Sequence, residues 1–280
     1  MSVTPSMNDP AEGSDELRQY RERWRLIPDG EPFRTHSSWL QPVLHQGEPA
    51  MLKVPFEEEE RWGGGLMVWW GGEGTARVLA HDENALLLER ATGNRRLEEM
   101  ARNGQDEEAT QILCAAAARL HAPRYRALPP MIPLTRWFAA LEPGAARHGG
   151  ILIQAAATAR ELLSTPQDLV PLHGDLHHGN VLDGGPRGWL VIDPKRLYGE
   201  RGFEYANLFR NPDLATSIAP GRLARHATLV ATEAGLDRTR LLKWVLALCG
   251  LSAAWILGDG EEPREDLAVA HLVVTELANP

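Results

Sequence analysis

The chain has 280 residues, of which 43% are hydrophobic and 24% charged, as in an ordinary globular protein, and its length suits two domains or one domain with two lobes. Its 38 acidic and 29 basic residues give a net charge of -9, the wrong sign for a protein that neutralises nucleic-acid phosphates. Two cysteines, Cys114 and Cys249, are too few for a disulfide framework. We therefore expect a folded protein without a nucleic-acid partner.

The N-terminal residues 1–13 lack a basic start followed by an apolar run, so they do not resemble a secretory signal. The most apolar window, residues 244–257, is shorter than the roughly 20 residues needed to cross a bilayer. We interpret it as a buried core helix. The sequence thus predicts a cytoplasmic protein without a membrane partner.

The first 90 residues alternate short β-type runs with two helical segments. An amphipathic helix is predicted over residues 15–25 and a second over 57–70, where Gly63, Gly64 and Gly65 each weaken the prediction by up to about 1 kcal/mol. Strands are predicted over residues 33–35, 39–44, 51–54, 76–80 and 85–89. This pattern indicates an N-terminal lobe, residues 1–90, with a leading helix, five strands and one inserted helix.

Residues 91–280 are predicted to be mainly helical and to form a second lobe. The predicted helices cover residues 96–102, 106–120, 151–163, 222–234, 238–257 and 264–277. Between them, residues 122–143 contain five prolines and are predicted to form an ordered loop. The two lobes together indicate an α+β fold.

One β-hairpin interrupts the helical half, with strands predicted from residue 181 and up to residue 192. Because a hairpin returns the chain to its starting edge, Asn180 and Asp193 should lie close together, with Asp175 one loop away. Amide and carboxylate oxygens are ligands that Mg²⁺ prefers. The hairpin therefore predicts a magnesium site.

Magnesium beside a carboxylate indicates phosphoryl transfer, which needs a cation on the phosphates and a carboxylate that orients the acceptor hydroxyl. Lys53, at the end of a predicted strand, would contact phosphates, and Asp175 would face the acceptor. Asn180 and Asp193 would hold Mg²⁺. The spacing from Asp175 to Asn180 also matches that of the kinase catalytic loop.

Two longer motifs resemble a known family. HGDLHHGNVL, from residue 173, resembles the catalytic loop of the aminoglycoside phosphotransferases. IDPKRLYGERGFEYANLFRNP, from residue 192, resembles the segment that carries the metal-binding aspartate in the streptomycin and hydroxyurea phosphotransferase branch. Similar matches at SSWLQPV, MLKV, ALLLERA and LLKWVLALCGLSAAW extend the resemblance over nearly the whole chain from about residue 33.

The resemblance implies a bilobal protein-kinase-like fold, with a small five-stranded antiparallel lobe and a mainly helical lobe. It implies an ATP-dependent and Mg²⁺-dependent kinase that acts on a hydroxyl of a small molecule, an aminoglycoside such as streptomycin, or hydroxyurea, as in antibiotic resistance. A kinase of an unidentified metabolite, or a catalytically weak nucleotide-binding protein, remains an alternative. A monomer and a dimer are both compatible with the sequence.

The resemblance also implies residue roles. Lys53 would be the nucleotide-binding lysine, held by Glu59 or by its neighbour Glu58. The other implied nucleotide contacts are made by the backbone, at the hinge by Glu89 and Ala91 and over the phosphates by Ser37 and Ser38.

Three departures from the protein-kinase pattern point to a constitutively active small-molecule kinase. The loop THSSW contains no glycine, so its phosphate contacts differ from those of a glycine-rich loop. Pro194 and Lys195 replace the Phe and Gly that follow the metal-binding aspartate in protein kinases, and Gly174 replaces the catalytic-loop arginine.

Several side chains have alternative interpretations. His173, His177 and His178 could form a zinc cluster, but a structural His173 with His177 or His178 near the acceptor is the favoured reading. Lys53 could instead be an edge lysine. A cationic acceptor would favour a cleft lined by carboxylates, and the candidates, which could also be surface residues, are Glu200, Glu204, Asp259, Glu261 and Glu262.

Overall fold

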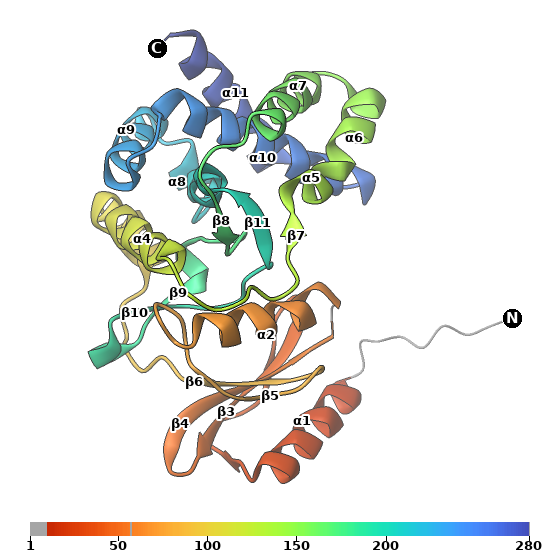
Figure 1. The fold of residues 1–280 in the computed structure, drawn as a ribbon, viewed down its shortest axis with the longest axis vertical. Coiled ribbons are helices and arrows are strands. Elements are labelled where there is room, and N and C mark those ends of the chain that lie inside the picture. Colours follow the sequence, from red (N-terminus) through yellow and green to blue (C-terminus); the bar gives the residue numbers. More distant parts are fainter. Residues whose placement is uncertain (1–9, 57, 280) are drawn as a thin grey trace, which may run out of the picture.

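The chain folds into a small mixed lobe and a larger helical lobe (Figure 1). A computed structural model describes residues 10–56 and 58–279, with side chains for residues 15–56 and 63–279. The small lobe contains α1 (Pro10–Trp24), β1 (Ile27–Pro28), β2 (Phe33–Arg34), β3 (Ser38–His45), β4 (Glu48–Pro55), α2 (Glu58–Trp70), β5 (Val78–His81) and β6 (Leu86–Glu89).

The small lobe is built on an antiparallel sheet with strand order β1-β3-β4-β6-β5, in which β2 pairs with the outer side of β3. The five predicted strands are present, and β1 is a sixth that the sequence analysis missed because it spans only two residues. Helix α1 packs on β3 and β4 through the buried Leu17, and Tyr20 donates a hydrogen bond to Asp82 at 3.0 Å.

Helix α2 lies on the side of this sheet that faces the larger lobe (Figure 1). It forms despite three glycines because Leu66, Met67 and Trp70 bury one of its faces. The indole of Trp70 donates a hydrogen bond to the carbonyl oxygen of Leu120 at 3.2 Å, which ties the helix to the larger lobe. Tertiary packing therefore outweighs the low helix propensity of the glycines.

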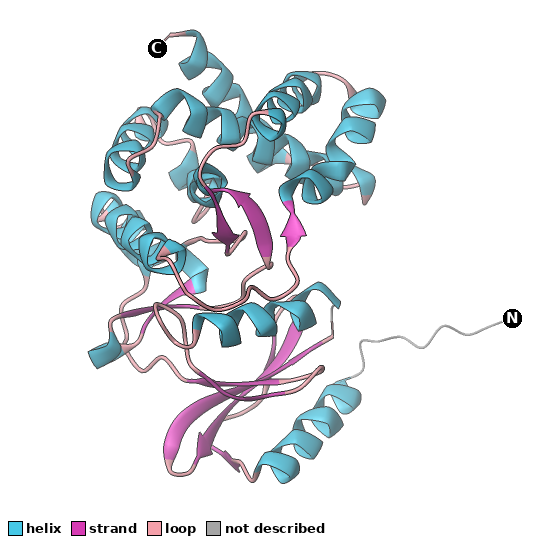
Figure 2. Ribbon diagram, in the orientation of Figure 1, coloured by secondary structure: helices cyan, strands magenta, loops and turns pink. Residues whose placement is uncertain are grey.

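The larger lobe is mainly helical, as predicted (Figure 2). Its helices are α3 (Leu97–Arg102), α4 (Asp106–His121), α5 (Leu134–Trp137), α6 (Leu141–His148), α7 (Ile151–Ser164), α8 (Leu214–Ser217), α9 (Arg222–Ala234), α10 (Arg238–Gly258) and α11 (Arg264–Ala278), with a 3-10 helix, η4, at Arg201–Arg210. Helix α10 packs against α6, α7, α11 and η4. It is long and apolar enough to cross a membrane, but 72% of its most apolar window is buried inside the fold, as expected of a core helix.

The prediction of a loop over residues 122–143 is wrong for its second half. That half contains β7 (Ile132–Pro133), α5, a 3-10 turn at Phe138–Ala140 (η1) and the start of α6. Leu134, Phe138 and Leu141 recur at helical spacing and are buried in the core. Pro133 directly precedes α5, where a proline does not interrupt helical hydrogen bonding, so the prolines do not prevent helix formation here.

The larger lobe also contains two small sheets. The predicted hairpin is present as β9 (Val181–Asp183) and β10 (Trp189–Val191). A three-stranded sheet was not predicted, and it joins β7 to β11 (Leu197–Glu200) and β8 (Leu169–Leu172). Its strands of two to four residues are too short to give a clear alternating pattern.

The two lobes are joined by backbone hydrogen bonds as well as by the chain itself. Ala76, after α2, donates to the carbonyl oxygen of Val191 at 3.0 Å, and Val191 donates to that of Gly74 at 3.0 Å. The segment that follows α2 therefore extends the β9–β10 hairpin. The domain boundary predicted at residues 90 and 91 falls in the segment that links β6 to α3.

Candidate active site

The hairpin brings Asn180 and Asp193 to one end of the β9–β10 pair. Val181 pairs with Val191, and Ile192 donates its backbone N–H to the carbonyl oxygen of Asn180 at 3.0 Å. Asp193 follows Ile192 directly, with a positive φ of 60°. An amide and a carboxylate from the two strand ends therefore lie at the same edge.

Lys53 reaches this edge from the small lobe. Its ammonium group lies 2.6 Å from Oδ1 of Asp193, and the lysine side chain is only 3% exposed. Lys53 lies on β4, between β3 and β6, so it is not on an edge strand. A buried lysine beside a carboxylate places a positive charge and a metal-binding oxygen at one point between the lobes.

The loop before Asp175 is held against the same edge by His173. The ring nitrogen Nδ1 of His173 accepts a hydrogen bond from the Asp175 N–H at 3.2 Å, so Nε2 carries the proton and donates to the carbonyl oxygen of Ile192 at 2.6 Å. The Lys195 N–H donates to the His173 carbonyl oxygen at 2.7 Å. His173 is thus a structural residue that links the Asp175 loop to the residues on both sides of Asp193.

The buried side chain of Glu204 anchors this loop through its backbone. Its carboxylate is 1% exposed and accepts hydrogen bonds from the backbone N–H groups of His173 and Gly174 at 2.7 and 2.9 Å, and contacts Nε2 of His121 at 3.1 Å. Burial alone would raise the pKa of Glu204, but the hydrogen bond and charge of His121, together with His173 and the Gly174 N–H, lower it. One interpretation of the sequence placed Glu204 in the lining of the acceptor cleft. It does not line this cleft but supports the Asp175 loop.

Asp175 is fixed through its backbone and its side chain. The amide Nδ2 of Asn180 donates to the Asp175 carbonyl oxygen at 2.9 Å, and Nδ2 of Asn207 donates to Oδ1 of Asp175 at 2.9 Å. Because the amide nitrogen of Asn180 is used in this bond, its oxygen Oδ1 is the atom that the side chain can offer to a cation. The donor set of Asn180 and Asp193 is made of hard oxygens, which fits Mg²⁺.

The three histidines at positions 173, 177 and 178 do not form a metal cluster: among the side chains that the structure describes, residues 15–56 and 63–279, no group of three or more His, Cys, Asp or Glu is placed to hold a metal ion. Nδ1 of His177 accepts a hydrogen bond from the Gly179 N–H at 3.1 Å, and burial lowers the pKa of His177. Burial, aided by the charge of Arg222, lowers the pKa of His178 to about 3, so this ring is neutral at pH 7. Neither His177 nor His178 lines the cleft around Asp175.

A cleft of about 1240 Å³ opens beside Asp175, between the Asp175 loop, α5, α6 and the end of α10. One wall carries the indoles of Trp137 and Trp255, which meet edge to face with ring centroids 5.3 Å apart. Among the described residues that line it, Asp175 and Asp259 are the only carboxylates. Six basic side chains also line it: Arg136, Arg147, His148, Lys195, Arg196 and Arg210.

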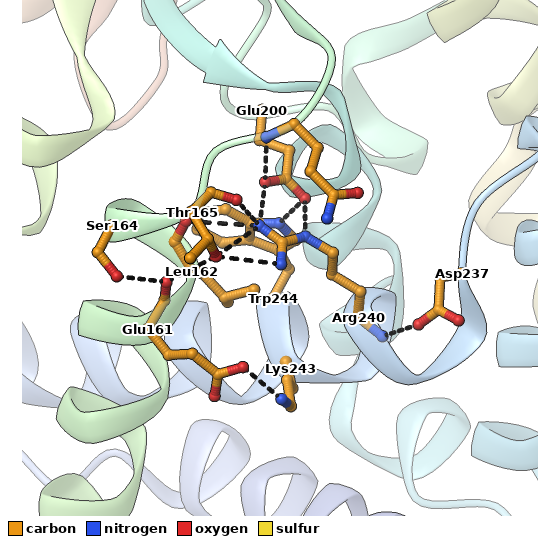
Figure 3. Close-up of polar contacts among 10 residues, drawn as sticks. Glu161, Leu162, Ser164, Thr165, Glu200, Asp237, Arg240, Lys243 and Trp244 are labelled. Atoms are coloured by element: carbon orange, nitrogen blue, oxygen red, sulfur yellow. Dashed lines mark hydrogen bonds and ion pairs between the residues drawn. The ribbon is translucent and has the colours of Figure 1, made fainter.

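The acidic lining that a cationic acceptor would favour is therefore mostly absent from the described part of this cleft. Asp259 is present, but Glu261 and Glu262 are not among its lining residues. Glu200 lies elsewhere, buried beside the side chains of Arg240 and Trp244 of α10 (Figure 3). Its carboxylate accepts hydrogen bonds from Nε and Nη2 of Arg240 at 2.7 and 2.6 Å and from the indole of Trp244 at 2.8 Å, so it is a structural residue.

Ser37 and Ser38, which are predicted to contact phosphates by their backbone, lie beside the end of β4, where Ser38 pairs with Pro55. The Ser38 N–H already donates to Oγ1 of Thr35 at 3.1 Å, and the Ser37 carbonyl oxygen accepts from Phe56 at 3.0 Å. This leaves the Ser37 N–H as the better candidate for a phosphate contact. The side chain of Glu59 lies outside the described residues, so its pairing with Lys53 stays a prediction.

At the hinge, the side chain of Glu89 is turned away from the site. Its carboxylate accepts a hydrogen bond from the Arg77 N–H at 2.8 Å and forms an ion pair with Arg187. Ala91 lines a separate cavity of about 540 Å³ together with Glu98 and Gly179. The hinge backbone and this cavity adjoin the catalytic loop.

Sequence reasoning did not single out Asn207 and Arg210, and it missed the roles of Glu204, which it named only as a candidate cleft carboxylate, and of Gly63. The residues whose roles were missed are Glu204, Asn207, Arg210 and Gly63. The first three lie in the motif at residues 192–212, so that motif could have indicated them, although its spacing alone does not show which side chains contact Asp175. Gly63 lies in α2, where an added Cβ would meet the carbonyl oxygen of Pro194 at 2.4 Å. The glycine permits the close approach of α2 to the segment after Asp193.

A small lobe that supplies a buried lysine, and a helical lobe that supplies an aspartate, an asparagine and a second aspartate, define a phosphotransferase with a protein-kinase-like fold. A solved structure of the same fold is the aminoglycoside phosphotransferase APH(3'')-Id from Streptomyces rimosus, with a TM-score of 0.60, 18% identity, and coverage of 88% of this chain and 99% of that one. The model of the aminoglycoside/hydroxyurea antibiotic resistance kinase family matches residues 23–260. The chain belongs to this family.

Two curated relatives match over most of their length. Streptomycin 3''-kinase of Klebsiella pneumoniae is 51% identical over 262 residues, which cover 92% of this chain and 98% of that protein. Hydroxyurea phosphotransferase of Kitasatospora aureofaciens is 31% identical over 273 residues, which cover 92% of this chain and 78% of that protein. The protein is therefore a small-molecule kinase, which transfers a phosphoryl group from ATP to a hydroxyl group of its acceptor.

Proposed function

We propose that the protein is a Mg²⁺-dependent streptomycin kinase that phosphorylates the 3'' hydroxyl. The observation that carries this proposal is the contact of Lys53 with Asp193, which His173 links to Asp175, a residue that lines a cleft large enough for a small-molecule acceptor. The 51% identity to a streptomycin 3''-kinase supports the choice of acceptor and position. Because ATP is its phosphoryl donor, we also propose that the protein works in the cytoplasm.

Lys53 would contact the phosphates of ATP, because its ammonium group is buried and points to the metal-binding edge. Asn180 Oδ1 and the carboxylate of Asp193 would hold Mg²⁺, which when bound neutralises charge on the phosphates. The Ser37 N–H would cover the phosphates from the small lobe. These residues would bind the triphosphate between the lobes, on one side of Asp175.

Asp175 would orient the acceptor hydroxyl and receive its proton. Its Oδ1 accepts the hydrogen bond from Asn207, so Oδ2 is the oxygen that faces the acceptor. Asp175 also lines the cleft, so a hydroxyl bound there can approach the carboxylate while the phosphates lie at the Lys53 edge. The acceptor oxygen would attack the γ-phosphorus of ATP, its proton would pass to Asp175, and ADP would leave on the opposite side.

At the hinge, the backbone of Glu89 and Ala91 would bind the adenine. The side chain of Glu89 is held by Arg187 and the Arg77 N–H, so the backbone is the part that can contact the base. The cavity lined by Ala91, Glu98 and Gly179 would receive the ribose.

The uneven charge of the cleft favours one orientation of a cationic acceptor. Trp255 and Asp259 lie one turn apart at the end of α10 and offer an aromatic face and a carboxylate, both of which attract guanidinium groups. Arg136 and Arg147 lie on α5 and α6 and repel such groups. A guanidinium-bearing ring of streptomycin would therefore lie towards Trp255 and Asp259.

Hydroxyurea is the second candidate acceptor. It is neutral, so it needs no carboxylates, and a cleft with six basic and two acidic lining side chains does not disfavour it. The 31% identity to a hydroxyurea phosphotransferase also supports it.

The test incubates the protein with Mg-ATP and, in separate reactions, streptomycin, hydroxyurea and a set of neutral sugars and amino alcohols. Mass spectrometry reads the addition of one phosphoryl group, and NMR of the product locates it. We expect phosphorylation of streptomycin at the 3'' position. Phosphorylation of hydroxyurea alone would favour the second candidate, and absence of acceptor-dependent ADP formation with every compound would refute a kinase of this substrate class.

A further inference from the structure

We propose that Asn207 is a positioning residue for Asp175, and that Arg210 and Asp266 fix the orientation in which its amide does so. This inference rests on the proposed role of Asp175 in phosphoryl transfer. It assigns a function to three side chains that the sequence analysis did not single out, two of which, Asn207 and Arg210, line the cleft beside Asp175.

Asn207 contacts the carboxylate of Asp175 directly. Nδ2 of Asn207 donates to Oδ1 of Asp175 at 2.9 Å, and Asn207 is only 5% exposed. The residue belongs to η4, whereas Asp175 follows β8, so the bond joins two elements of the larger lobe. It limits rotation of the Asp175 side chain and leaves Oδ2 for the acceptor hydroxyl.

Arg210 explains why the side-chain amide of Asn207 turns its nitrogen, and not its oxygen, towards Asp175. Oδ1 of Asn207 accepts hydrogen bonds from Nε and Nη2 of Arg210 at 3.2 and 2.9 Å. A guanidinium group only donates hydrogen bonds, so the amide oxygen must face Arg210 and the nitrogen must face Asp175. Arg210 therefore determines which end of the amide meets the catalytic carboxylate.

Asp266 holds the guanidinium group of Arg210 in place. Its Nη1 forms an ion pair with Oδ1 of Asp266, a buried residue of α11, and Oγ of Ser252 on α10 donates to Oδ2 of Asp266 at 3.1 Å. Burial would lower the pKa of Arg210, but the charge and hydrogen bond of Asp266, together with other groups such as Asp175, raise it, so the guanidinium stays charged. The hydrogen-bonded series Asp175, Asn207, Arg210, Asp266 thus connects the catalytic carboxylate to two core helices.

Loss of the Asn207 contact should lower the rate of phosphoryl transfer and leave nucleotide binding unchanged. A catalytic group displaced by about 1 Å can lose a factor of roughly 100 in rate, because the reactive geometry is populated less often. The side chain of Asn207 bonds to Asp175, Arg210 and Asn211, none of which is proposed to bind nucleotide or metal, so binding of Mg-ATP should be unaffected. We expect Asn207→Ala to lower kcat by a factor of roughly 10 to 100 and to change the KM for ATP by less than about threefold.

The test is a double-mutant cycle with the full-length protein. Streptomycin phosphorylation and ATP hydrolysis by water are measured for the parent, Asn207→Ala, Asp175→Ala and the double variant. If Asn207 acts through Asp175, its substitution costs less than about twofold once Asp175 is already alanine. The same fold-loss in both backgrounds would overturn the inference, because it would show that Asn207 acts on the fold in general.

Asn207→Asp is a second variant in case the alanine variant does not fold. It keeps the size of the side chain and the acceptor oxygens that contact Arg210, but replaces the donor that faces Asp175 with an oxygen. We expect a loss of kcat at least as large as that of Asn207→Ala, with a melting temperature near that of the parent. Unchanged kcat in Asn207→Asp would overturn the inference.

The matched control is Thr110→Val. Thr110 is buried in α4, and its hydroxyl bonds to the Asp106 carbonyl oxygen at 2.8 Å and to His226 at 3.2 Å, away from the cleft. It should lower the melting temperature but leave kcat within about twofold. If the parent phosphorylates none of the acceptors, the proposed function fails, and the ATP hydrolysis cycle still decides the role of Asn207.

Discussion

Lys53 and Asp193 come from different lobes, and their side chains meet 2.6 Å apart. The lysine extends from the central part of the small-lobe sheet, whereas the aspartate follows the β9–β10 hairpin. The docking of one lobe on the other therefore brings together the cation proposed to bind phosphate and the carboxylate proposed to bind the metal. Backbone hydrogen bonds between Val191 and the segment Gly74–Ala76 hold the lobes in this relation.

Removal of the Lys53 charge should impair ATP use more than folding. A hydrogen bond to a charged group contributes about 1.5–3 kcal/mol, so we expect Lys53→Met to lower kcat/KM for ATP by a factor of roughly 10 to 100. Steady-state kinetics with varied ATP measures this. Lys243→Met, which removes an exposed ion pair with Glu161, is the control and should retain parental kinetics. Equal kinetics for both variants would contradict the assigned role of Lys53.

Asp193→Ala should abolish the thermal stabilisation that Mg-ATP gives the parent. A ligand that binds only the folded state raises the melting temperature in proportion to its binding free energy, and Asp193 is proposed to hold the metal of that complex. Melting curves with and without Mg-ATP measure the shift. Asp168→Ala, which removes the exposed ion pair with Arg201, should retain the parental shift. A full shift in Asp193→Ala would argue against its role as a metal ligand.

Asp175→Ala should separate catalysis from nucleotide binding. A positioned base contributes typically 10² to 10⁴-fold, so turnover should fall by at least about 100-fold. The shift in melting temperature with Mg-ATP should stay near the parental value, because Asp175 contacts Asn180 and Asn207 and lies on the acceptor side. Parental turnover in this variant would show that Asp175 is not the base.

The hairpin illustrates what the sequence could predict. Asn180 and Asp193 flank two short strands with a turn between them, so local geometry alone brings them together. The contact between Asp175 and Asn207 joins residues 32 positions apart through an irregular 3-10 segment. No periodic pattern encodes such a contact, since it depends on how η4 packs under the loop.

The charge of the cleft could not be predicted for a different reason. A net charge of -9 describes the whole chain, whereas the cleft collects basic side chains from α5, α6 and the segment after Asp193. Glu200 and Glu204 were candidates for its lining, but both lie in the interior, where hydrogen bonds to Arg240 and to backbone N–H groups compensate their burial. Composition does not reveal which acids are structural.

Glu204→Gln should destabilise the fold in a pH-dependent way. The amide group places a donor against one of the N–H groups of His173 and Gly174, so we expect a loss of about 1–3 kcal/mol at pH 7. The pKa of Glu204 is lower in the folded state, so its ionised form contributes stability above the ordinary glutamate pKa of about 4.3. This contribution is lost as pH falls through the folded-state pKa.

Urea unfolding of the parent and Glu204→Gln at pH 7, 5 and 4 measures this difference. The difference in free energy of unfolding should be full at pH 7 and pH 5 and should begin to narrow below about pH 4.5. Glu161→Gln is the control, because Glu161 is 53% exposed in its ion pair with Lys243, and it should cost less than about 0.5 kcal/mol. If the difference in free energy of unfolding between the parent and Glu204→Gln widened as the pH falls, the pKa of Glu204 would not be lowered in the folded state.

Gly63→Ala and Gly65→Ala should have opposite effects although both lie in α2. In a helix interior, Gly→Ala normally stabilises by about 1 kcal/mol, and an added Cβ at Gly65 would meet nothing within 4 Å. At Gly63 the Cβ would lie 2.4 Å from the backbone carbonyl oxygen of Pro194, the residue that follows Asp193. Either α2 or the metal-binding segment must move, at a cost of about 1–3 kcal/mol.

We therefore expect Gly65→Ala to raise the melting temperature by about 2–4 °C with kinetics near those of the parent. Gly63→Ala should lower the melting temperature and reduce kcat/KM for ATP at least about fivefold, since displacement of Pro194 also displaces Asp193 from Lys53. Differential scanning fluorimetry and steady-state kinetics measure both effects. If Gly63→Ala were as stable and active as Gly65→Ala, the close approach of α2 to Pro194 would not constrain the metal-binding edge.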